Sequence, residues 1–309
     1  MTYLDIDTIL VSGGGMNSMG ILGCLKYLIE NEFIDSELKI FKNIIGVSGG
    51  LIHILPIILG YTIDETIDLF TKVNINDYLD DRIRLRFIIE NYGIHDTFIL
   101  KELSKLILKY KNYSEDLNLS ELYKLTNKNI LFKTVNLTKE KILFVNHKNF
   151  PDLPLSTAIC MTSCAPLLFK PIRYKGDLYI DGGYCGNFPF DIEKRYKKYI
   201  GINIIINDLQ TNTLKNKSNK NIVDNISDYL KLIFKLSGTQ VRESDIKKNI
   251  ININIYGSGL NFKEKNNHKS NIIKEGYNQT DKHFKSMIAW KHTLEVQYLN
   301  VSQINGRSS

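Results

Sequence analysis

A serine between glycines, Gly46-Val47-Ser48-Gly49-Gly50, is the group of residues whose spacing points most directly to chemistry. The pentapeptide fits G-x-S-x-G, the pattern of a sharp strand-to-helix turn that presents a serine hydroxyl to a substrate. Small flanking residues are needed because larger side chains would block the bend and the approach to the hydroxyl. We predict that Ser48 is a nucleophile for acyl transfer and that Gly46 and Gly50 support its turn. A plain glycine-rich turn is the alternative interpretation.

A second group, Ser12-Gly13-Gly14-Gly15, follows the first predicted strand. Consecutive glycines allow backbone N–H groups to converge at a helix N-terminus, where negative charge is favoured. Such a loop can hold an oxyanion or a phosphate. The phosphate patterns do not fit, because G-x-x-x-x-G-K-[ST] is absent and G-x-G-x-x-G from Gly13 needs glycine where the chain has Ser18. The sequence therefore favours donors for an oxyanion, with a simple tight turn as the alternative.

A third group, Asp181-Gly182-Gly183, directly follows another predicted strand. A carboxylate at a strand end, followed by residues without side chains, stays open to a neighbouring loop and can accept a proton from a serine hydroxyl. The same tripeptide is also favourable in an ordinary turn. We predict that Asp181 is a catalytic base.

The elements around these groups indicate an α/β protein. Residues 6–11 form an apolar run rich in β-branched side chains, and apolar residues then recur at helical spacing over 16–29. Residues 44–47 and the apolar segment 51–60 repeat the pattern. Two consecutive strand-helix units imply a parallel sheet with helices on its faces. All three groups then lie at the sheet edge where open α/β proteins place their sites.

Hydrophobic spacing predicts the remaining elements. Helices are expected in succession over 64–111 and again over 155–163. Strands are expected at 130–137, 141–146, 171–174, 178–180, 199–206 and 250–256. Beyond residue 207 we expect a polar loop at 212–221, helices at 222–248 and 276–299, and a frayed tail at 302–309.

Together the three groups resemble the patatin-like phospholipase family, in which a glycine-rich loop, a G-x-S-x-G elbow and a distant Asp-Gly-Gly or Asp-Gly-Ala motif occur in this order. The stretch SGGGMNSMGILGCLKYL at 12–28 is similar to the family's opening strand, loop and helix. Residues 157–168 and the segment DGGYCGNFPFD at 181–191 are similar to the region around the family's aspartate, including Asn187 and Pro189.

The resemblance spans about residues 5–207 and implies a three-layer α/β/α fold with a mainly parallel central sheet. We expect a patatin-like catalytic domain over 1–210. Residues 211–309 are expected to form a C-terminal helical extension packed on the same core.

The resemblance also implies a lipid acyl hydrolase with a Ser-Asp dyad. Ser48 would attack an acyl ester, Asp181 would take its proton, and the N–H groups of Gly14 and Gly15 would hold the oxyanion. Because a carboxylate is a weak base for a hydroxyl, we expect Asp181 to be partly desolvated and in short contact with Ser48. No metal or other cofactor is implied. The glycines expected to support these motifs are Gly13, Gly46, Gly50, Gly182 and Gly183.

The chain departs from the family pattern at three positions. Asn17 and Ser18 stand where the family usually has a basic residue and a glycine, and Gly49 stands where many members have alanine. The missing cation affects how an oxyanion would be stabilised, although backbone donors need no side chain.

Two other functions fit parts of the sequence. An α/β-hydrolase with a Ser-His-Asp triad shares G-x-S-x-G, and His268, His283 and His292 follow Asp181 in the order that fold requires. Against the triad, only two predicted strands precede Ser48, and we expect these histidines on surfaces or helix faces and His53 in the core or lining the cleft. A catalytically inactive lipid- or protein-binding member of the fold is the second alternative. No zinc finger or other nucleic-acid-binding motif occurs, so we expect no nucleic-acid partner.

Composition is that of a soluble globular protein, with 43% hydrophobic and 24% charged residues and a formal net charge of +7. Neither a secretory signal nor an apolar run of membrane-spanning length is recognisable, and the four cysteines lack disulfide or metal spacing. We therefore expect an intracellular, cytoplasmic protein. Peripheral contact with lipid is also expected, and the candidate segments are 51–61 and 98–110, for which core packing is the alternative.

Overall fold

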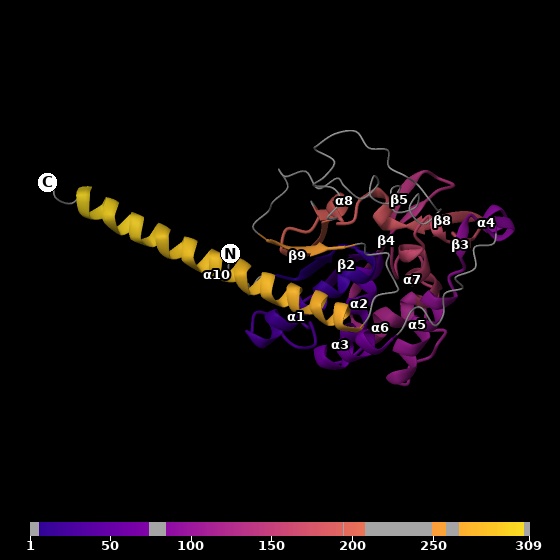
Figure 1. Ribbon diagram of the computed structural model, residues 1–309. Coiled ribbons are helices and arrows are strands. Elements are labelled where there is room, and N and C mark those ends of the chain that lie inside the picture. Colours follow the sequence, from indigo (N-terminus) through magenta and orange to yellow (C-terminus); the bar gives the residue numbers. More distant parts are fainter. Residues whose placement is uncertain (1–5, 74–84, 194, 208–248, 258–265, 306–309) are drawn as a thin grey trace.

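The computed structural model describes residues 6–73, 85–193, 195–207, 249–257 and 266–305 (Figure 1). The loop expected at 212–221, the helix expected at 222–248 and the domain boundary expected between 210 and 211 all lie outside the described residues.

A mixed sheet forms the centre of the fold. In the described part of the chain its strand order is β10-β9-β1-β2-β4-β8-β7, and β5 pairs with β4 beside this path. The pairs from β10 to β4 are parallel, whereas β4–β5, β4–β8 and β7–β8 are antiparallel. The strands of the sheet are β1 (Thr8–Val11), β2 (Asn43–Val47), β4 (Asn129–Asn136), β5 (Lys141–Val145), β7 (Ile172–Tyr174), β8 (Asp177–Asp181), β9 (Tyr199–Asn207) and β10 (Ile250–Tyr256).

Helices cover both faces of this sheet, and two further short strands pair beside it. The helical elements are η2 (Gly15–Met19), α1 (Gly20–Glu30), α2 (Ser48–Ile58), α3 (Ile63–Lys72), α4 (Leu85–Asn91), α5 (Phe98–Tyr110), α6 (Leu119–Thr126), α7 (Leu155–Ser163), η4 (Gly182–Cys185), α8 (Phe190–Glu193) and α10 (Asn266–Asn305). The strands β3 (Gly93–His95) and β6 (Leu167–Phe169) pair with each other in parallel.

Alternating side chains of the parallel strands divide the core into two layers. Ile9 and Ile44 face a large cluster that includes residues of α1, α2 and α5. Their neighbours Leu10 and Ile45 face a smaller cluster completed by Ile192 of α8. Figure 1 shows α1, α2 and α3 on one side of the sheet and α8 on the other. The arrangement is the three-layer α/β/α fold expected from the sequence.

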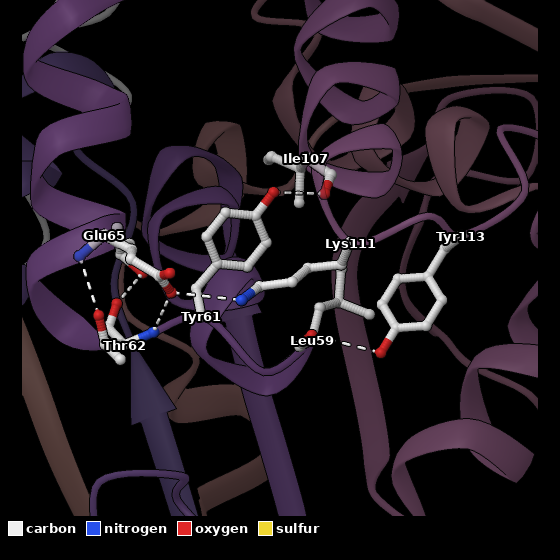
Figure 2. Close-up of polar contacts among 8 residues, drawn as sticks. Leu59, Tyr61, Thr62, Glu65, Ile107, Lys111 and Tyr113 are labelled. Carbon is white, nitrogen blue, oxygen red and sulfur yellow. Dashed lines mark hydrogen bonds and ion pairs between the residues drawn. The ribbon is translucent and has the colours of Figure 1, made fainter.

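Helix α2 is anchored where it ends, and the contacts are drawn in Figure 2. The hydroxyl of Tyr61 donates to the carbonyl of Ile107 on α5 over 2.7 Å. The Lys111 ammonium lies 4.8 Å from the Tyr61 ring centroid and 3.3 Å from a carboxylate oxygen of Glu65. Glu65 in turn completes a capping box with Thr62 at the start of α3. These contacts join α2, α3 and α5.

The two segments considered for lipid contact differ in exposure. Within 51–61, only Gly60 is exposed, so this segment belongs to the core. On α5, the side chains of Leu103 and Ile107 are buried in the core. Those of Phe98, Leu106 and Tyr110 are exposed. Among the described residues, no helix has the combination of length and apolar character that would let it cross a membrane.

The sequence-based elements are largely confirmed, and their errors are concentrated in short or polar segments. The helix at 155–163 and the strand at 250–256 are found with the expected bounds. The helices expected in succession over 64–111 are present as α3, α4 and α5 in the described residues, but the strand β3, which pairs with β6, lies between α4 and α5 and was not predicted. The helix α6 was not anticipated.

The closing helix begins at Asn266, ten residues before the expected start at Gly276. The polar stretch around His268 was expected to be solvated, but Lys269 is only 5% exposed. Its ammonium donates to the carbonyls of Phe70, Thr71 and Val73 at the end of α3. A lysine that satisfies helix C-terminal carbonyls explains why this polar segment is ordered. His268 itself is half-buried.

Helices α1 and α10 approach each other closely at two glycines. A Cβ added at Gly23 would overlap the carbonyl of Ile273, and one at Gly276 would overlap the carbonyl of Gly20. Both obstructing atoms belong to the backbone, which cannot rotate away. The helix crossing therefore requires glycine on both partners.

We expect Gly23→Ala to lower the free energy of unfolding by about 1–3 kcal/mol because the helices must separate. The sign of this change distinguishes close helix packing from an open helix face, since glycine-to-alanine changes in an unobstructed helix stabilise it by about 1 kcal/mol. Urea unfolding of wild type, Gly23→Ala and Gly276→Ala measures the effect. An unchanged or higher midpoint in both variants would contradict the close approach.

Candidate active site

The turn at Ser48 carries backbone strain at the expected nucleophile. Strand β2 ends in extended conformation at Val47, and Ser48, the first residue of α2, has a φ of 50°. This left-handed backbone costs a residue with a side chain roughly 1–2 kcal/mol. The N–H of Ser48 donates to Oγ1 of Thr162 over 3.0 Å, and that hydroxyl donates to the carbonyl of Lys133 over 2.6 Å. These bonds tie Ser48 to β4 through α7.

The glycines beside Ser48 are required by close packing. A Cβ at Gly46 would lie 2.7 Å from Cβ of Leu51, and one at Gly50 would overlap the carbonyl oxygen of Ser12. The second contact brings the Ser48 turn against the end of β1, which precedes the glycine loop. Larger residues at either position would push these elements apart.

Two strands on one edge of β4 bring Ser48 and Asp181 together. Strand β2 runs parallel to β4 and ends with Val47 opposite Lys133, whereas β8 runs antiparallel and ends with Asp181 opposite Thr134. The Oγ of Ser48 donates to Oδ2 of Asp181 over 2.7 Å. The short contact expected from the sequence is present.

Burial makes the Asp181 carboxyl unusually basic. Ser48 is 9% exposed and Asp181 is 5% exposed. Desolvation raises the pKa of Asp181 to about 6, while the hydrogen bonds from Ser48 and Gly183 and the charge of Lys133 oppose the rise. The N–H of Gly183 donates to Oδ1 over 2.6 Å, which leaves Oδ2 for the serine. At neutral pH the carboxyl is therefore ionised but a better base than an exposed aspartate.

The glycine loop lies directly beside Ser48. Gly14 and Gly15 have φ values of 148° and 56°, which glycine adopts without strain. The N–H of Gly13 donates to the carbonyl of Asn187 over 2.9 Å, and a Cβ at Gly13 would lie 3.3 Å from Cβ of Ser48. The role of the Gly14 and Gly15 N–H groups as oxyanion donors stays a prediction.

Asn187 lies between the glycine loop at 13–15 and the Asp181-Gly182-Gly183 turn. Besides accepting from Gly13 through its carbonyl, it places its side-chain Oδ1 between the loops. A Cβ at Gly13 would lie 3.0 Å from this oxygen, and one at Gly183 would lie 2.7 Å from it. The absence of side chains at Gly13 and Gly183 therefore makes room for the Asn187 amide. Asn187 lies in the segment that resembles the patatin-like family, but the resemblance assigned it no role.

Ser18 and Gly49, two of the departures from the family pattern, are in contact. The Ser18 hydroxyl donates to the carbonyl of Gly15 over 2.5 Å and lies 2.9 Å from Nδ1 of His53. A Cβ at Gly49 would lie 2.6 Å from this hydroxyl and 2.7 Å from the Gly15 carbonyl oxygen. The loss of a methyl group at Gly49 thus accommodates the added hydroxyl at Ser18. The third departure, Asn17, donates from its side-chain amide to the carbonyl of Gly257.

Two polar residues of the site escaped the sequence analysis. Thr162 holds the Ser48 amide, and Lys133 is a fully buried lysine within β4. Lys133 carried a recognisable signal, because it interrupts the apolar run Ile130-Leu131-Phe132 and lysine is seldom buried without a partner. Thr162 had no such signal, since its role depends on a contact between distant segments.

The described histidine side chains do not contact Ser48 as a triad would require. The hydrogen bond from the Ser48 hydroxyl goes to Asp181. His53 is buried and contacts Ser18, and burial lowers its pKa to about 4, so it is neutral. His283 packs against Phe284, and the side chain of His292 lies outside the described part. Among the described side chains, no histidine is hydrogen-bonded to Ser48. The same residues include no cluster of three or more side chains that could bind a metal.

The strand order and the strained serine turn place the molecule among α/β/α proteins of the patatin-like fold. The crystal structure of VipD from Legionella pneumophila matches with a TM-score of 0.60 at 17% identity, over 91% of this chain and 67% of VipD. A family model described as Patatin-like phospholipase matches residues 9–193. The chain belongs to the patatin-like phospholipase family.

Two viral relatives have similar sequences. An uncharacterized protein of Acanthamoeba polyphaga mimivirus is 27% identical over 229 residues, which are 73% of this chain and 74% of the relative. The "Probable lipid hydrolase 463L" of Invertebrate iridescent virus 6 is 28% identical over 192 residues, or 61% of this chain and 63% of that protein.

The contact between Ser18 and Gly49 predicts non-additive stability. We expect Gly49→Ala to lower the free energy of unfolding by about 1–3 kcal/mol, because the new methyl group meets the Ser18 hydroxyl and the Gly15 carbonyl. In a Ser18→Gly background the same change should destabilise less. Urea unfolding of wild type, the two single variants and the double variant gives the coupling energy between the two positions. Equal losses in both backgrounds would show that the two positions are independent.

The raised pKa of Asp181 predicts that this residue destabilises the fold as the pH rises. Its folded-state pKa of about 6 lies above the ordinary 3.8, so the folded state is favoured below pH 4 and loses this advantage through pH 6. As the pH rises from 4 to 8, the free energy of unfolding of Asp181→Asn should therefore increase by roughly 3 kcal/mol relative to that of wild type. Urea unfolding at several pH values measures the difference.

Asp177→Asn on the same strand provides a control of opposite sign. The hydrogen bond from Lys139 lowers the pKa of Asp177, so its contribution to stability is present at neutral pH and lost on acidification. Parallel pH profiles for wild type and Asp181→Asn would show that Asp181 titrates normally.

Proposed function

We propose that the protein is a lipid acyl hydrolase that uses Ser48 as nucleophile and Asp181 as general base. The observation that carries this proposal is the 2.7 Å hydrogen bond between the two side chains at the strained turn. Membership of the patatin-like phospholipase family supports lipid hydrolysis in general. The name of the iridescent virus relative agrees with the same class of substrate.

In the acylation step, Oγ of Ser48 forms a bond to the ester carbonyl carbon while its proton passes to Oδ2 of Asp181. The carbonyl π electrons move onto the oxygen, and the N–H groups of Gly14 and Gly15 stabilise the resulting oxyanion. When the intermediate collapses, the bond to the alcohol breaks and Asp181 returns its proton to the leaving oxygen. An acyl-enzyme and a free alcohol result.

Deacylation uses the same groups with water as nucleophile. Asp181 accepts a proton from the water as its oxygen attacks the acyl carbon, and then returns the proton to Oγ of Ser48 as the ester bond breaks. The products are a free fatty acid and the original enzyme. A base with a pKa of about 6 suits this cycle, because it is ionised near neutral pH yet close enough to it to accept a proton.

The exposed face of α5 supports peripheral contact with a lipid surface. Phe98 is 52% exposed, Leu106 is 43% exposed and Tyr110 is 63% exposed. Apolar and aromatic side chains interleaved with Lys101 and Lys109 are suited to the interface of an anionic bilayer. Such adsorption would bring the enzyme to substrate molecules that are insoluble in water.

We expect Ser48→Ala to lower kcat/KM for a 4-nitrophenyl ester and for phospholipid vesicles by at least about 1,000-fold, because the acyl acceptor is lost. Asp181→Asn should lower it by about 100- to 10,000-fold, because the amide cannot accept the proton. A fluorophosphonate probe should label wild type on Ser48 and leave Ser48→Ala unlabelled. Ser104→Ala, which removes a buried hydroxyl of α5, and Asp177→Asn serve as controls with retained activity.

The other outcomes separate the rival functions. Loss of turnover in a single histidine-to-alanine variant, with Asp181→Asn still active, would indicate a triad instead of a dyad. A folded wild type that neither reacts with the probe nor hydrolyses any ester would indicate a binding protein. Loss of activity with a chelator would show dependence on a metal.

A further inference from the structure

Lys133 is a charged residue in one of the least exposed places of the molecule. It lies within β4, between Val47 of β2 and Phe144 of β5, and its side chain is fully buried. An ammonium group loses several kcal/mol of hydration on burial unless partners replace the water. Packing alone therefore does not explain why a lysine occupies this buried position.

The partners of Lys133 belong to the turn that follows Asp181. Its ammonium donates to the carbonyl of Gly186 over 2.9 Å and to that of Cys185 over 3.2 Å. A Cβ at Gly182 would overlap the Lys133 carbonyl and lie 2.8 Å from its Cγ. The turn from 182 to 186 therefore packs directly against Lys133, and the absence of a side chain at Gly182 allows this close approach.

The charge of Lys133 also acts on Asp181. The groups that face the Asp181 carboxyl are the Ser48 hydroxyl from α2, the Gly183 N–H from η4, the Lys133 ammonium from β4 and the Cys164 thiol after α7. Burial raises the pKa of the Cys164 thiol well above its usual value, so this group is neutral. The titratable residues of η4, Tyr184 and Cys185, are exposed. Within this described set, Lys133 supplies the positive charge.

We propose that Lys133 is a positioning residue that holds the 182–186 turn so that Asp181 reaches Ser48, and whose charge keeps the buried carboxylate ionised. The inference rests on the dyad proposed above. It also gives the site a cation although Asn17 stands where the family usually has a basic residue. The charge of Lys133 acts on the base, whereas a cation beside the glycine loop would act on the oxyanion.

The pH dependence of turnover tests the electrostatic part. Wild type should lose kcat/KM on acidification with an apparent pKa near 6. In Lys133→Met this acid limb should move to higher pH, because a nearby opposite charge lowers the pKa of a carboxyl and the Met side chain carries no charge. Lys133→Arg should restore the wild-type position. Lys133→Gln keeps hydrogen-bond donors without the charge and replaces the Met variant if that protein does not fold.

Lys128→Met is the matched control for removal of a buried lysine. Lys128 is 8% exposed, and its ammonium also donates to two carbonyls, those of Leu38 and Phe41, away from the dyad. We expect its removal to lower stability and leave the acid limb unchanged. An acid limb that stays in place in both Lys133→Met and Lys133→Gln would overturn the proposal.

A second readout does not depend on activity. The unfolding free energy of Lys133→Gln, compared with wild type, should keep falling above pH 6, because the pKa of Asp181 rises further without the lysine. In an Asp181→Asn background this difference in pH dependence should disappear. If the enzyme hydrolyses no ester but the difference is found, the proposed function fails and the Lys133–Asp181 coupling stands. If the difference is absent, the coupling itself is refuted.

Discussion

The site depends on how strand β4 divides one of its edges between two partners. Up to Lys133 this edge pairs with β2, and from Thr134 onwards it pairs with β8, which runs in the opposite direction. Strand β5 occupies the other edge over the same stretch. Because β2 and β8 run towards each other and stop at adjacent residues of β4, their ends must meet. Ser48 and Asp181 are the residues at that meeting point, 133 positions apart in the chain.

The same geometry sets the stability of the fold against the basicity of the Asp181 carboxyl. A carboxyl between packed strands is poorly hydrated, and this makes it basic and also destabilises its charged form. The surrounding hydrogen bonds and Lys133 reduce that penalty without removing it. A fully solvated aspartate would cost the fold less, but it would be a poorer acceptor for a hydroxyl proton. Strain at Ser48 adds to the same compromise.

Sequence reasoning succeeded where the signal is local. Apolar runs that end in glycine predicted β1, β2 and β8, and the fold and the Ser48–Asp181 contact followed from their order. The strands β3 and β6 were missed because three residues carry too little pattern and are stabilised by each other. The helix α6 begins with a capping box from Asn118 to Glu121, a polar signal that hydrophobic spacing alone does not reveal. Thr162 and Lys133 act across segments far apart in the chain, so no spacing along the sequence could assign their roles.

The packing of α10 on α1 has a consequence for how the protein is made. The segment that carries the glycine loop, η2 and α1 is synthesised long before α10, yet its outer surface is covered by α10, and the side chain of Asn17 donates to the carbonyl of Gly257, 240 positions later. Contacts of such long sequence separation form slowly, since much chain must be ordered to close them. During synthesis, the side of α1 that packs against α10 therefore stays uncovered until α10 has been made. Nascent chains in this interval are candidates for chaperone capture or aggregation.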